Sequence, residues 1–358
     1  MKFLFVDASH DGWGTEQHLV SLALGLLESG HDVAAIVQQG SPTERWLENT
    51  GIVVLPVRYR TGVDWRFLAA MLRQIRQQRP DWIIANQSKL YWPLALLGKA
   101  TGLRVALFRH LVRIKRWHTR VLLPKLVGRF YVVSDFARDE LVRNGGSRLH
   151  ITRLYNPINT QRFRSNPSAR AALRARLGVA DSDIVAGFVG RIEPAKGVCT
   201  LRDAVFNAMD VLPQLKMVWV GDGVSKQETM QLAAARGHLR RQVFVGWSAA
   251  PEEYYAGFDV LIAPSIEAET FGRVVAEAQS CGVPVIASDI GGLPEAMVAN
   301  KTGVLVSPGN VAKLTHALVT LSTDDVLRMQ FADAGQQFVM DNFSTLLVCK
   351  EFIESLLT

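Results

Sequence analysis

Short apolar runs alternate with amphipathic segments along the whole chain. In its first half, residues 3–7, 33–37, 52–55, 82–85, 103–108 and 130–133 are predicted strands. Helices are predicted between them at residues 16–29, 64–78, 90–100 and 135–143. Short, wholly apolar strands that alternate with helices are typical of parallel sheets buried on both faces. We therefore expect an α/β domain with helices on both sides of its sheet.

A second alternation of the same kind begins at residue 184. Its predicted strands are residues 184–189, 216–220, 243–245, 260–263, 283–287 and 304–306. Residues 156–183, between the two alternations, are rich in Asn, Ser, Arg and Pro and are interpreted as a linker. We expect a first domain over residues 1–165 and a second over residues 166–342, both doubly wound.

The composition is that of a globular protein with a core, since 48% of the residues are hydrophobic and 20% are charged. No apolar run approaches the roughly 20 residues of a membrane span. The first seven residues are too short for a signal-peptide core and reach an acid at Asp7. Three scattered cysteines indicate neither a disulfide framework nor a zinc site. A cytoplasmic location is expected.

Positive charge is concentrated in the first half. Residues 1–165 hold 24 Lys and Arg against 12 Asp and Glu, whereas residues 166–358 hold 16 against 21. This asymmetry favours an anionic partner for the first domain: a membrane surface, a phosphorylated saccharide or nucleic acid. Nucleic acid is the least favoured, because no recognised nucleic-acid module accompanies the charge.

Residues 104–129 carry eight of these cations and no acid, with Trp117 and several leucines between them. As a helix, this segment would be basic and amphipathic, and suited to an anionic membrane surface. A solvated basic face is the alternative.

Two glutamates mark the stretch that follows residues 260–263. Glu269 and Glu277 are eight positions apart, and a helix from here to Cys281 would place them about 12 Å apart along its axis. That is about the reach from a sugar, across a diphosphate, to a ribose. Free amides at Phe271, Gly272 and Arg273 in the first turn would bind an anion. The alternative is a pair of ordinary helix-surface acids.

The residues around these glutamates resemble a family signature. Phe271-Gly272 follows the first Glu, and Ala278-x-x-Cys281-Gly282-x-Pro284-Val285 follows the second. The combination resembles the retaining glycosyltransferases of family 4. The resemblance implies the α/β GT-B fold, with two Rossmann-like domains facing across a cleft. With it we expect a C-terminal helix, residues 343–358, that returns to the first domain.

Two cations five positions apart follow the first strand of the second domain. Arg191 and Lys196 lie on a loop before a helix, from which both could face one diphosphate. The resemblance assigns Gly190, Arg191 and Lys196 to the donor-diphosphate clamp, and it implies a place near the nucleotide base for Gly246. A charged turn is the alternative.

The first domain supplies a glycine-containing loop and a histidine. Gly12, Gly14 and Thr15 follow the first strand, where glycines permit a tight turn and close approach. The resemblance implies that this loop meets the donor, although Trp13 separates the usually adjacent glycines. His110 follows a strand at the edge where α/β sheets bind ligands. The resemblance implies a His near the donor sugar, and His118 is the competing candidate.

We therefore expect a retaining, hexosyltransferase-type enzyme with Glu269 and His110 as catalytic residues. Its donor is a nucleotide-diphosphate sugar, with a UDP-sugar favoured, and its acceptor is a glycan or a lipid-linked glycan. Lipopolysaccharide or other envelope-polysaccharide synthesis is the expected pathway, at the inner face of the cytoplasmic membrane. Arg191, Lys196 and helix amides would neutralise the leaving diphosphate, and Glu277 would accept hydrogen bonds from the ribose. No cofactor and no metal are expected.

Two other functions remain open. A nucleotide-sugar 2-epimerase of GT-B architecture would use the same diphosphate clamp without an acceptor. A non-catalytic membrane-surface scaffold would keep the fold without the chemistry. The set of Arg191, Lys196, Glu269 and Glu277 argues against the scaffold.

Overall fold

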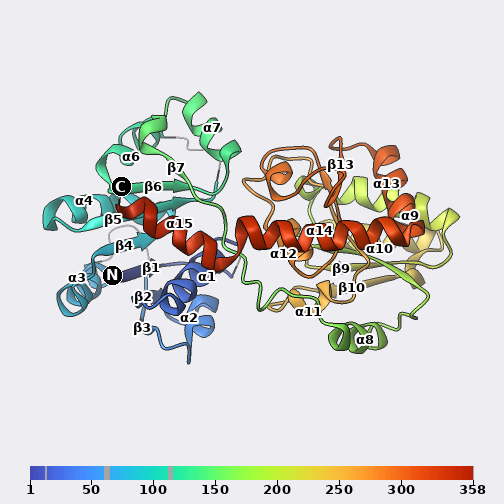
Figure 1. Ribbon diagram of the computed structural model, residues 1–358, viewed down its shortest axis with the longest axis horizontal. Helices are drawn as coiled ribbons and strands as arrows, with labels where there is room; N and C mark the ends of the chain where they lie inside the picture. The colour runs from blue at the N-terminus through green and yellow to red at the C-terminus, as the bar shows by residue number, and fades with distance from the viewer. Residues whose placement is uncertain (13, 60–64, 112–115, 358) are drawn as a thin grey trace. The chain divides into compact units, whose positions relative to one another are not determined.

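The computed structural model describes residues 1–12, 14–59, 65–111 and 116–357, and it contains two compact units (Figure 1). Unit 1 comprises Met1–Pro157 and Thr345–Thr358, and unit 2 comprises Ile158–Ser344. Each unit is a parallel sheet with helices on both faces. The prediction of two doubly wound α/β domains is confirmed.

The sheet of unit 1 has seven strands in the order β3-β2-β1-β4-β5-β6-β7. They are β1 Lys2–Asp7, β2 Asp32–Gln38, β3 Val53–Val57, β4 Trp82–Ala85, β5 Arg104–Arg109, β6 Arg129–Val132 and β7 Thr152–Arg153. The helices are α1 Gly14–Glu28, α2 Pro42–Leu47, α3 Trp65–Gln78, α4 Ser88–Thr101, α5 Trp117–Val121, α6 Leu123–Leu126, α7 Asp135–Arg143, the 3-10 turn η1 Arg148–His150 and α15 Thr345–Leu357.

The sheet of unit 2 has six strands in the order β10-β9-β8-β11-β12-β13. They are β8 Ile184–Val189, β9 Leu215–Val220, β10 Gln242–Gly246, β11 Val260–Ala263, β12 Val285–Ser288 and β13 Gly303–Val306. The helices are α8 Pro167–Arg176, α9 Val198–Val211, α10 Lys226–Ala235, α11 Glu252–Tyr255, α12 Arg273–Ser280, α13 Val311–Thr323 and α14 Asp325–Phe343, with 3-10 turns η2 Pro194–Lys196, η3 Leu239–Arg241 and η4 Leu293–Ala296.

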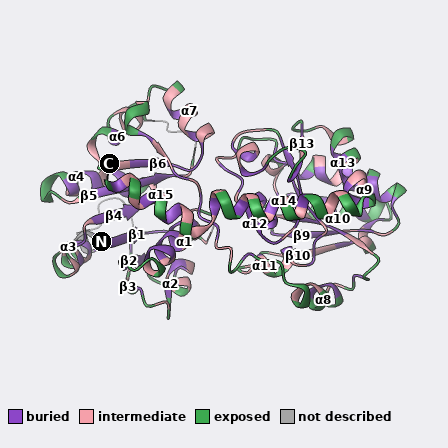
Figure 2. Ribbon diagram, viewed as in Figure 1, coloured by how far each residue is buried: buried purple, intermediate pink, exposed green. Residues whose placement is uncertain are grey.

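Both faces of each sheet are buried, as Figure 2 shows along the strands. In β1, Phe3 and Phe5 belong to one core cluster, and Leu4 and Val6 belong to another on the opposite face. Burial on both faces explains why the strands are apolar along their length rather than alternating.

Helix α15 contributes to the core of unit 1. Val348, Cys349 and Phe352 pack in the same cluster as Phe3. A Cβ built on Gly25 of α1 would lie only 2.3 Å from Thr345 and 2.6 Å from Cys349. The two helices can therefore approach this closely only because position 25 lacks a side chain.

The division between the units lies between Pro157 and Ile158, earlier than the expected boundary after residue 165. Contacts within unit 2 explain the difference. Arg162 forms an ion pair with Glu252 at 2.7 Å, and the Ser280 hydroxyl donates to the Phe163 carbonyl at 2.5 Å. At the other end, the return to unit 1 begins at Thr345 rather than at residue 343.

Four local features differ from the predictions, and the first is the expected linker over residues 156–183, which contains helix α8. Residues 104–129 do not form one helix, because β5 and β6 occupy the ends and Pro124 begins the separate helix α6. Strand β3 extends past Pro56, which an edge strand tolerates. Strand β7 was not predicted, since a two-residue strand carries no hydrophobic period.

Candidate active site

The unit 2 loops that carry predicted donor residues after β8 and β11 meet at the edge of the sheet formed by the carboxyl ends of the strands. Strand order runs outward in both directions from β8 and β11, so the carboxyl ends of these strands form a topological switch point, where open α/β sheets bind ligands. The amide of Ile266 donates to the Ala195 carbonyl at 3.1 Å. A Cβ on Gly197 would lie 1.8 Å from the Pro264 carbonyl oxygen, so the loops following β8 and β11 touch through their backbones.

Lys196 and Glu269 are brought together at this edge. Lys196 Nζ lies 2.8 Å from Glu269 Oε2, and both side chains are only partly exposed. The Ser265 hydroxyl donates to Glu269 Oε1. A role for Ser265 was not predicted, because its hydrogen bond to Glu269 depends on the conformation of the loop.

Arg191 lies on the same loop as Lys196 but has a different partner. Its Nη1 lies 2.9 Å from Glu193 Oε2, in a pair where the arginine side chain is 51% exposed. An ion pair this exposed contributes little stability, about 0–1 kcal/mol. A bound diphosphate would therefore compete with Glu193 at little cost.

Helix α12 begins at Arg273, later than predicted, so Glu269 lies in a loop and not on the helix. Gly272 is the N-cap, with φ at +104°, a conformation that L side chains rarely adopt. The helical estimate of about 12 Å between Glu269 and Glu277 therefore does not apply. Phe271 is buried and packs edge-on against Phe343, with ring centroids 5.0 Å apart, so its side chain belongs to the core.

Glu277 is buried, and both of its oxygens accept hydrogen bonds. The Tyr255 hydroxyl donates to Oε2 at 3.0 Å, and Arg273 Nε donates to Oε1 at 2.7 Å. Burial raises the pKa of Glu277, whereas the neighbouring Arg273 and the two hydrogen bonds lower it. Sequence analysis missed Tyr255, since no motif marks it.

Gly190 and Gly246 lie where strands β8 and β10 end, on either side of Gly221. The Gly221 amide donates to the Gly246 carbonyl at 2.7 Å. A Cβ on Gly221 would lie 1.8 Å from the Gly190 carbonyl oxygen. Close backbone packing at the ends of these strands thus requires a glycine at position 221, which lies between Gly190 and Gly246 in the sheet.

In unit 1, the predicted loop connects β1 to α1. A Cβ on Gly12 would lie 3.0 Å from Pro42. Gly14 and Thr15 begin α1, and the Thr15 carbonyl accepts from Asn86 Nδ2 at 2.9 Å. Asn86 follows β4, so it ties this helix start to the neighbouring strand end.

His110 directly follows β5. Its ring packs edge-on against His18 of α1, with centroids 4.6 Å apart. His118, the competing candidate, lies on α5 and packs against Trp92 and Trp117. His18 was not predicted as a site residue, because its contact with His110 depends on how α1 packs against the end of β5.

Buried ionisable groups also lie at this edge of unit 1. Asp7 is 1% exposed and accepts from the Thr43 hydroxyl at 2.5 Å, and burial raises its pKa. Lys89 Nζ donates to the Ala8 carbonyl at 2.6 Å. Burial lowers the pKa of Lys89, while the carboxylates of Asp7, Asp11 and Glu16 raise it. A polar network that the sequence did not reveal therefore surrounds the loop.

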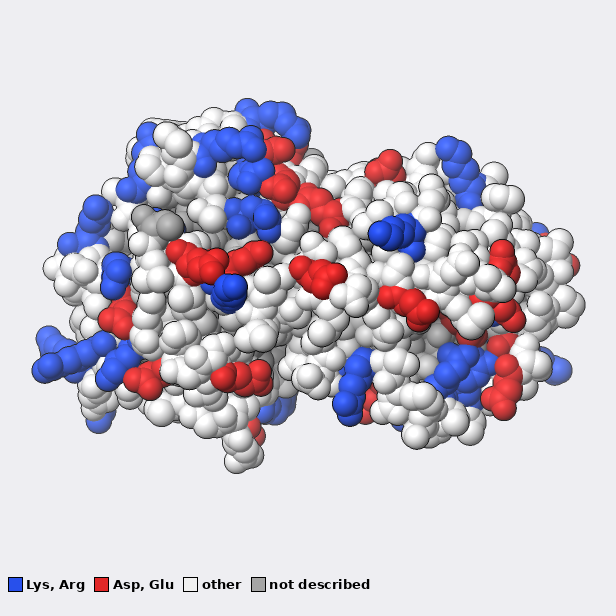
Figure 3. All heavy atoms as spheres, in the orientation of Figure 1, with Lys and Arg blue, Asp and Glu red and all other residues white. Residues whose placement is uncertain are grey.

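The surface of unit 1 carries groups of Lys and Arg side chains in the view of Figure 3. Within residues 104–129, Trp117 is 62% exposed and Leu122 is 41% exposed. Arg113 and Lys115 of this segment lie outside the described residues. Exposed apolar and cationic side chains thus occur together on short helices rather than on one amphipathic helix.

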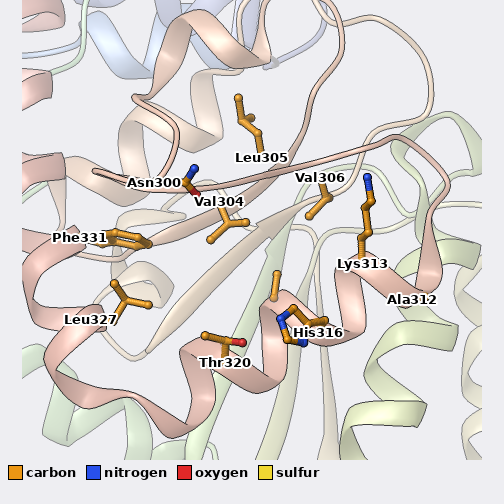
Figure 4. Close-up of a pocket in the computed structure, with 11 residues that line it drawn as sticks. Asn300, Val304, Leu305, Val306, Ala312, Lys313, His316, Thr320, Leu327 and Phe331 are labelled. Carbon is orange, nitrogen blue, oxygen red and sulfur yellow. The ribbon is translucent and has the colours of Figure 1, made fainter.

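Unit 2 also contains a surface pocket of about 760 Å³ between β13, α13 and α14 (Figure 4). Val304, Val306 and Phe331 contribute apolar walls, and Lys313 and His316 project from α13. Its lining shares no residue with the predicted site.

Within the described ranges, no group of three or more His, Cys, Asp or Glu residues has an arrangement that could hold a metal ion. None of the helices in the described part of the chain has the length and apolar character that crossing a membrane requires.

Comparison with known proteins gives two family matches. The model of the glycosyl transferases group 1 family matches residues 169–338, and the model of glycosyltransferase family 4 matches residues 13–162. Among solved structures, Anabaena HepE in complex with UDP and glucose aligns over 100% of both chains, with a TM-score of 0.86 and 24% identity. At this identity the likeness concerns the fold, and with the two family matches it confirms the predicted GT-B fold.

Curated relatives are similar over part of their length. A D-inositol 3-phosphate glycosyltransferase of Streptomyces bingchenggensis is 36% identical over 198 residues, which cover 52% of this chain and 43% of that protein. A phosphatidyl-myo-inositol mannosyltransferase of Mycobacterium leprae is 33% identical over 229 residues, 63% of this chain and 56% of that protein. The chain spans about half the length of the curated relatives it matches.

Proposed function

The chain belongs to glycosyltransferase family 4, and we propose that it transfers a sugar, with retention, from a nucleotide-diphosphate sugar to a glycan or lipid-linked acceptor. The single observation that carries this proposal is the 2.8 Å contact between Lys196 and Glu269. In a sugar donor, the leaving phosphate is bonded to the anomeric carbon, so a phosphate-binding cation and a sugar-binding carboxylate must be neighbours.

The proposed chemistry requires charge stabilisation more than proton transfer. A glycosyl transition state resembles an oxocarbenium ion, and the diphosphate gains negative charge as its bond to the sugar breaks. Arg191 and Lys196 bind this charge, and the N-terminal amides of α12 add to it. Glu269 holds the donor sugar near its anomeric carbon, and His110 of unit 1 is the second proposed catalytic residue.

The donor nucleotide is bound at the same edge of unit 2. Glu277 accepts hydrogen bonds from the ribose through the lone pairs that Tyr255 and Arg273 leave, since each carboxylate oxygen accepts more than one bond. A UDP-sugar is the proposed donor, in line with the UDP bound by the structural relative named above. Binding needs no metal, because the cations of the loop after β8 take its role.

The acceptor is proposed to carry a phosphate or to sit at an anionic membrane. Residues 1–165 hold twice as many cations as acids. The two curated relatives are named for an inositol phosphate and a phosphatidyl-inositol acceptor. Lipopolysaccharide or another envelope polysaccharide is the proposed product pathway, with the enzyme at the inner face of the membrane.

Incubation of the protein with radiolabelled UDP-, GDP- and ADP-sugars and a membrane lipid extract tests the proposal. We expect one donor to give labelled lipid or glycan that depends on the extract. Conversion of the donor to an epimer in the absence of the extract would indicate that the protein is an epimerase rather than a transferase. If no donor gives either a labelled transfer product or an epimer, both enzymatic functions are overturned.

A further inference from the structure

Beneath His110 lies a second histidine that the chemistry above does not use. His18 of α1 is 0% exposed. Its ring centroid lies 4.6 Å from that of His110, with the two ring planes at 68°. On another side, His18 packs on Phe108 at 4.7 Å. The His110 ring therefore rests on a fully buried imidazole.

The support under His18 extends into the core of unit 1. Phe108 stacks on Tyr131 with centroids 4.7 Å apart and planes at 19°. The Tyr131 hydroxyl lies 2.6 Å from Ser355 Oγ of α15, and burial raises the Tyr131 pKa to about 12. The rings of Tyr131, Phe108 and His18 thus pack in succession and support the His110 ring from the core.

Asn86 determines which nitrogen of His18 carries the proton. Asn86 Nδ2 donates to the Thr15 carbonyl at 2.9 Å, and because a carbonyl only accepts, this contact fixes the amide orientation. The same Nδ2 lies 3.4 Å from His18 Nδ1. We therefore expect His18 Nδ1 to accept this hydrogen bond and the ring proton to lie on Nε2.

Simple core packing does not account for this arrangement. A phenylalanine would fill a ring-shaped core position without placing a ring nitrogen, Nδ1, within reach of the Asn86 amide. His18 instead takes a hydrogen bond from Asn86, which also holds the start of α1 where Thr15 lies. One buried amide thus connects the predicted donor loop to the ring under His110.

We propose that His18 is a positioning residue for His110. It holds the His110 ring at a fixed height and angle, and Asn86 couples that ring to the loop carrying Thr15. The inference rests on the proposed function, because His110 has a task only if a donor sugar is bound.

The first test does not depend on catalysis. Long-range ¹H–¹⁵N spectra of protein labelled at histidine report the tautomer of each ring. We expect His18 to carry its proton on Nε2, and His18→Phe to shift the His110 signals. His31→Phe is the matched control, since His31 packs edge-on against Phe3 of the same unit at 5.6 Å. It should leave the His110 signals in place. A proton on His18 Nδ1, or unmoved His110 signals in His18→Phe, overturns the inference.

The second test measures transfer by the same variants. Misplacing a reacting group by about 1 Å can cost about 10²-fold, so His18→Phe should lower kcat about 10- to 100-fold. Its donor KM should stay within about 3-fold, as expected when only orientation is lost. His18→Gln, whose amide oxygen can accept from Asn86 in place of Nδ1, should recover part of kcat and remains informative if the Phe variant does not fold.

Two results distinguish a failure of this inference from a failure of the proposed function. A folded His18→Phe variant with the kcat of the wild type overturns the inference and leaves the proposed function standing. Absence of transfer by the wild type removes the proposed function, while the spectra still report on the His18–His110 contact.

Discussion

The hydroxyl of Tyr255 lies 3.0 Å from Oε2 of Glu277, inside unit 2. This contact joins a carboxylate of the candidate donor site, on α12, to a short helix, α11, that no motif marks. A donor to a carboxylate stabilises its charged form and lowers its pKa, so Tyr255 opposes the effect of burial on Glu277.

Glu277 should make the stability of the protein fall as pH rises above about 4.5. Burial raises its pKa in the folded state above the ordinary 4.5, so between these values the folded protein holds a proton that the unfolded chain has lost. Glu277→Gln lacks this titration. The melting temperature of the wild type minus that of Glu277→Gln should be constant below pH 4.5, and this difference should fall above pH 4.5.

Each pKa unit corresponds to about 1.4 kcal/mol, and about 1 kcal/mol moves the melting temperature of a unit of this size by about 2–4 °C. Tyr255→Phe should steepen the fall, because it removes a hydrogen bond to the charged form. A difference that rises with pH would mean that Arg273 outweighs burial.

Arg191→Ala and Lys196→Ala should each slow transfer about 10²- to 10³-fold, because each leaves charge on the departing diphosphate unpaired. Steady-state rates at saturating acceptor measure the effect. Lys216→Ala is the matched control: the Lys216 side chain is 25% exposed, against 27% for Lys196, but it lies near the start of β9, at the opposite end of the strands. Rates near the wild-type value for both clamp variants would refute the assignment.

Transfer should survive EDTA. The proposed mechanism meets the diphosphate charge with side-chain cations and helix amides, so chelation should change the initial rate little. Complete loss of activity that magnesium or manganese restores would instead reveal a cation site.

Changing Arg113, Lys115, Arg116 and Arg120 together to Ser should weaken binding to anionic vesicles at low salt. Each basic residue near such a surface contributes on the order of 1 kcal/mol, screened within about 8 Å at physiological salt. Cosedimentation at low and high salt measures this binding. Arg73, Arg76 and Arg79 changed to Ser, at exposed positions on and after α3, serve as the control.

Loss of vesicle binding in the quadruple variant alone would support a membrane contact by this segment. An equal loss per charge removed, four in the first variant and three in the control, would indicate attraction by net charge only. If the wild type does not sediment with vesicles at low salt, the segment is a solvated face, and a soluble acceptor is favoured.

Much of the fold could be predicted because burial on both faces leaves a direct trace in the sequence. Phe3 to Val6 are all apolar because alternate residues enter different cores. The expectation of one basic helix over residues 104–129 was wrong because it was based on charge and not on the hydrophobic pattern. Counting charges identifies a basic segment but not its elements, and it overlooked the strands that the hydrophobic pattern predicts at residues 103–108 and 130–133.

The candidate site was predictable as a set of residues but not as a set of contacts. Lys196 and Glu269 could be chosen from their motifs, whereas their 2.8 Å contact arises from two loops that meet at the switch point. Glu269 was placed on a helix because helical periodicity does not show that Gly272, at a φ of +104°, is the N-cap. His18 and Asn86 are 68 positions apart, so only the pairing of β1 with β4 brings them together.

The packing of α15 against α1 has a consequence for the order of events during synthesis. Val348 and Phe352 complete a cluster whose other members include Phe3 and Leu22. A ribosome makes all of unit 2 before it reaches these two residues. The first unit to emerge is therefore the last to be completed, and until then the apolar side chains of this cluster lack their contacts with Val348 and Phe352.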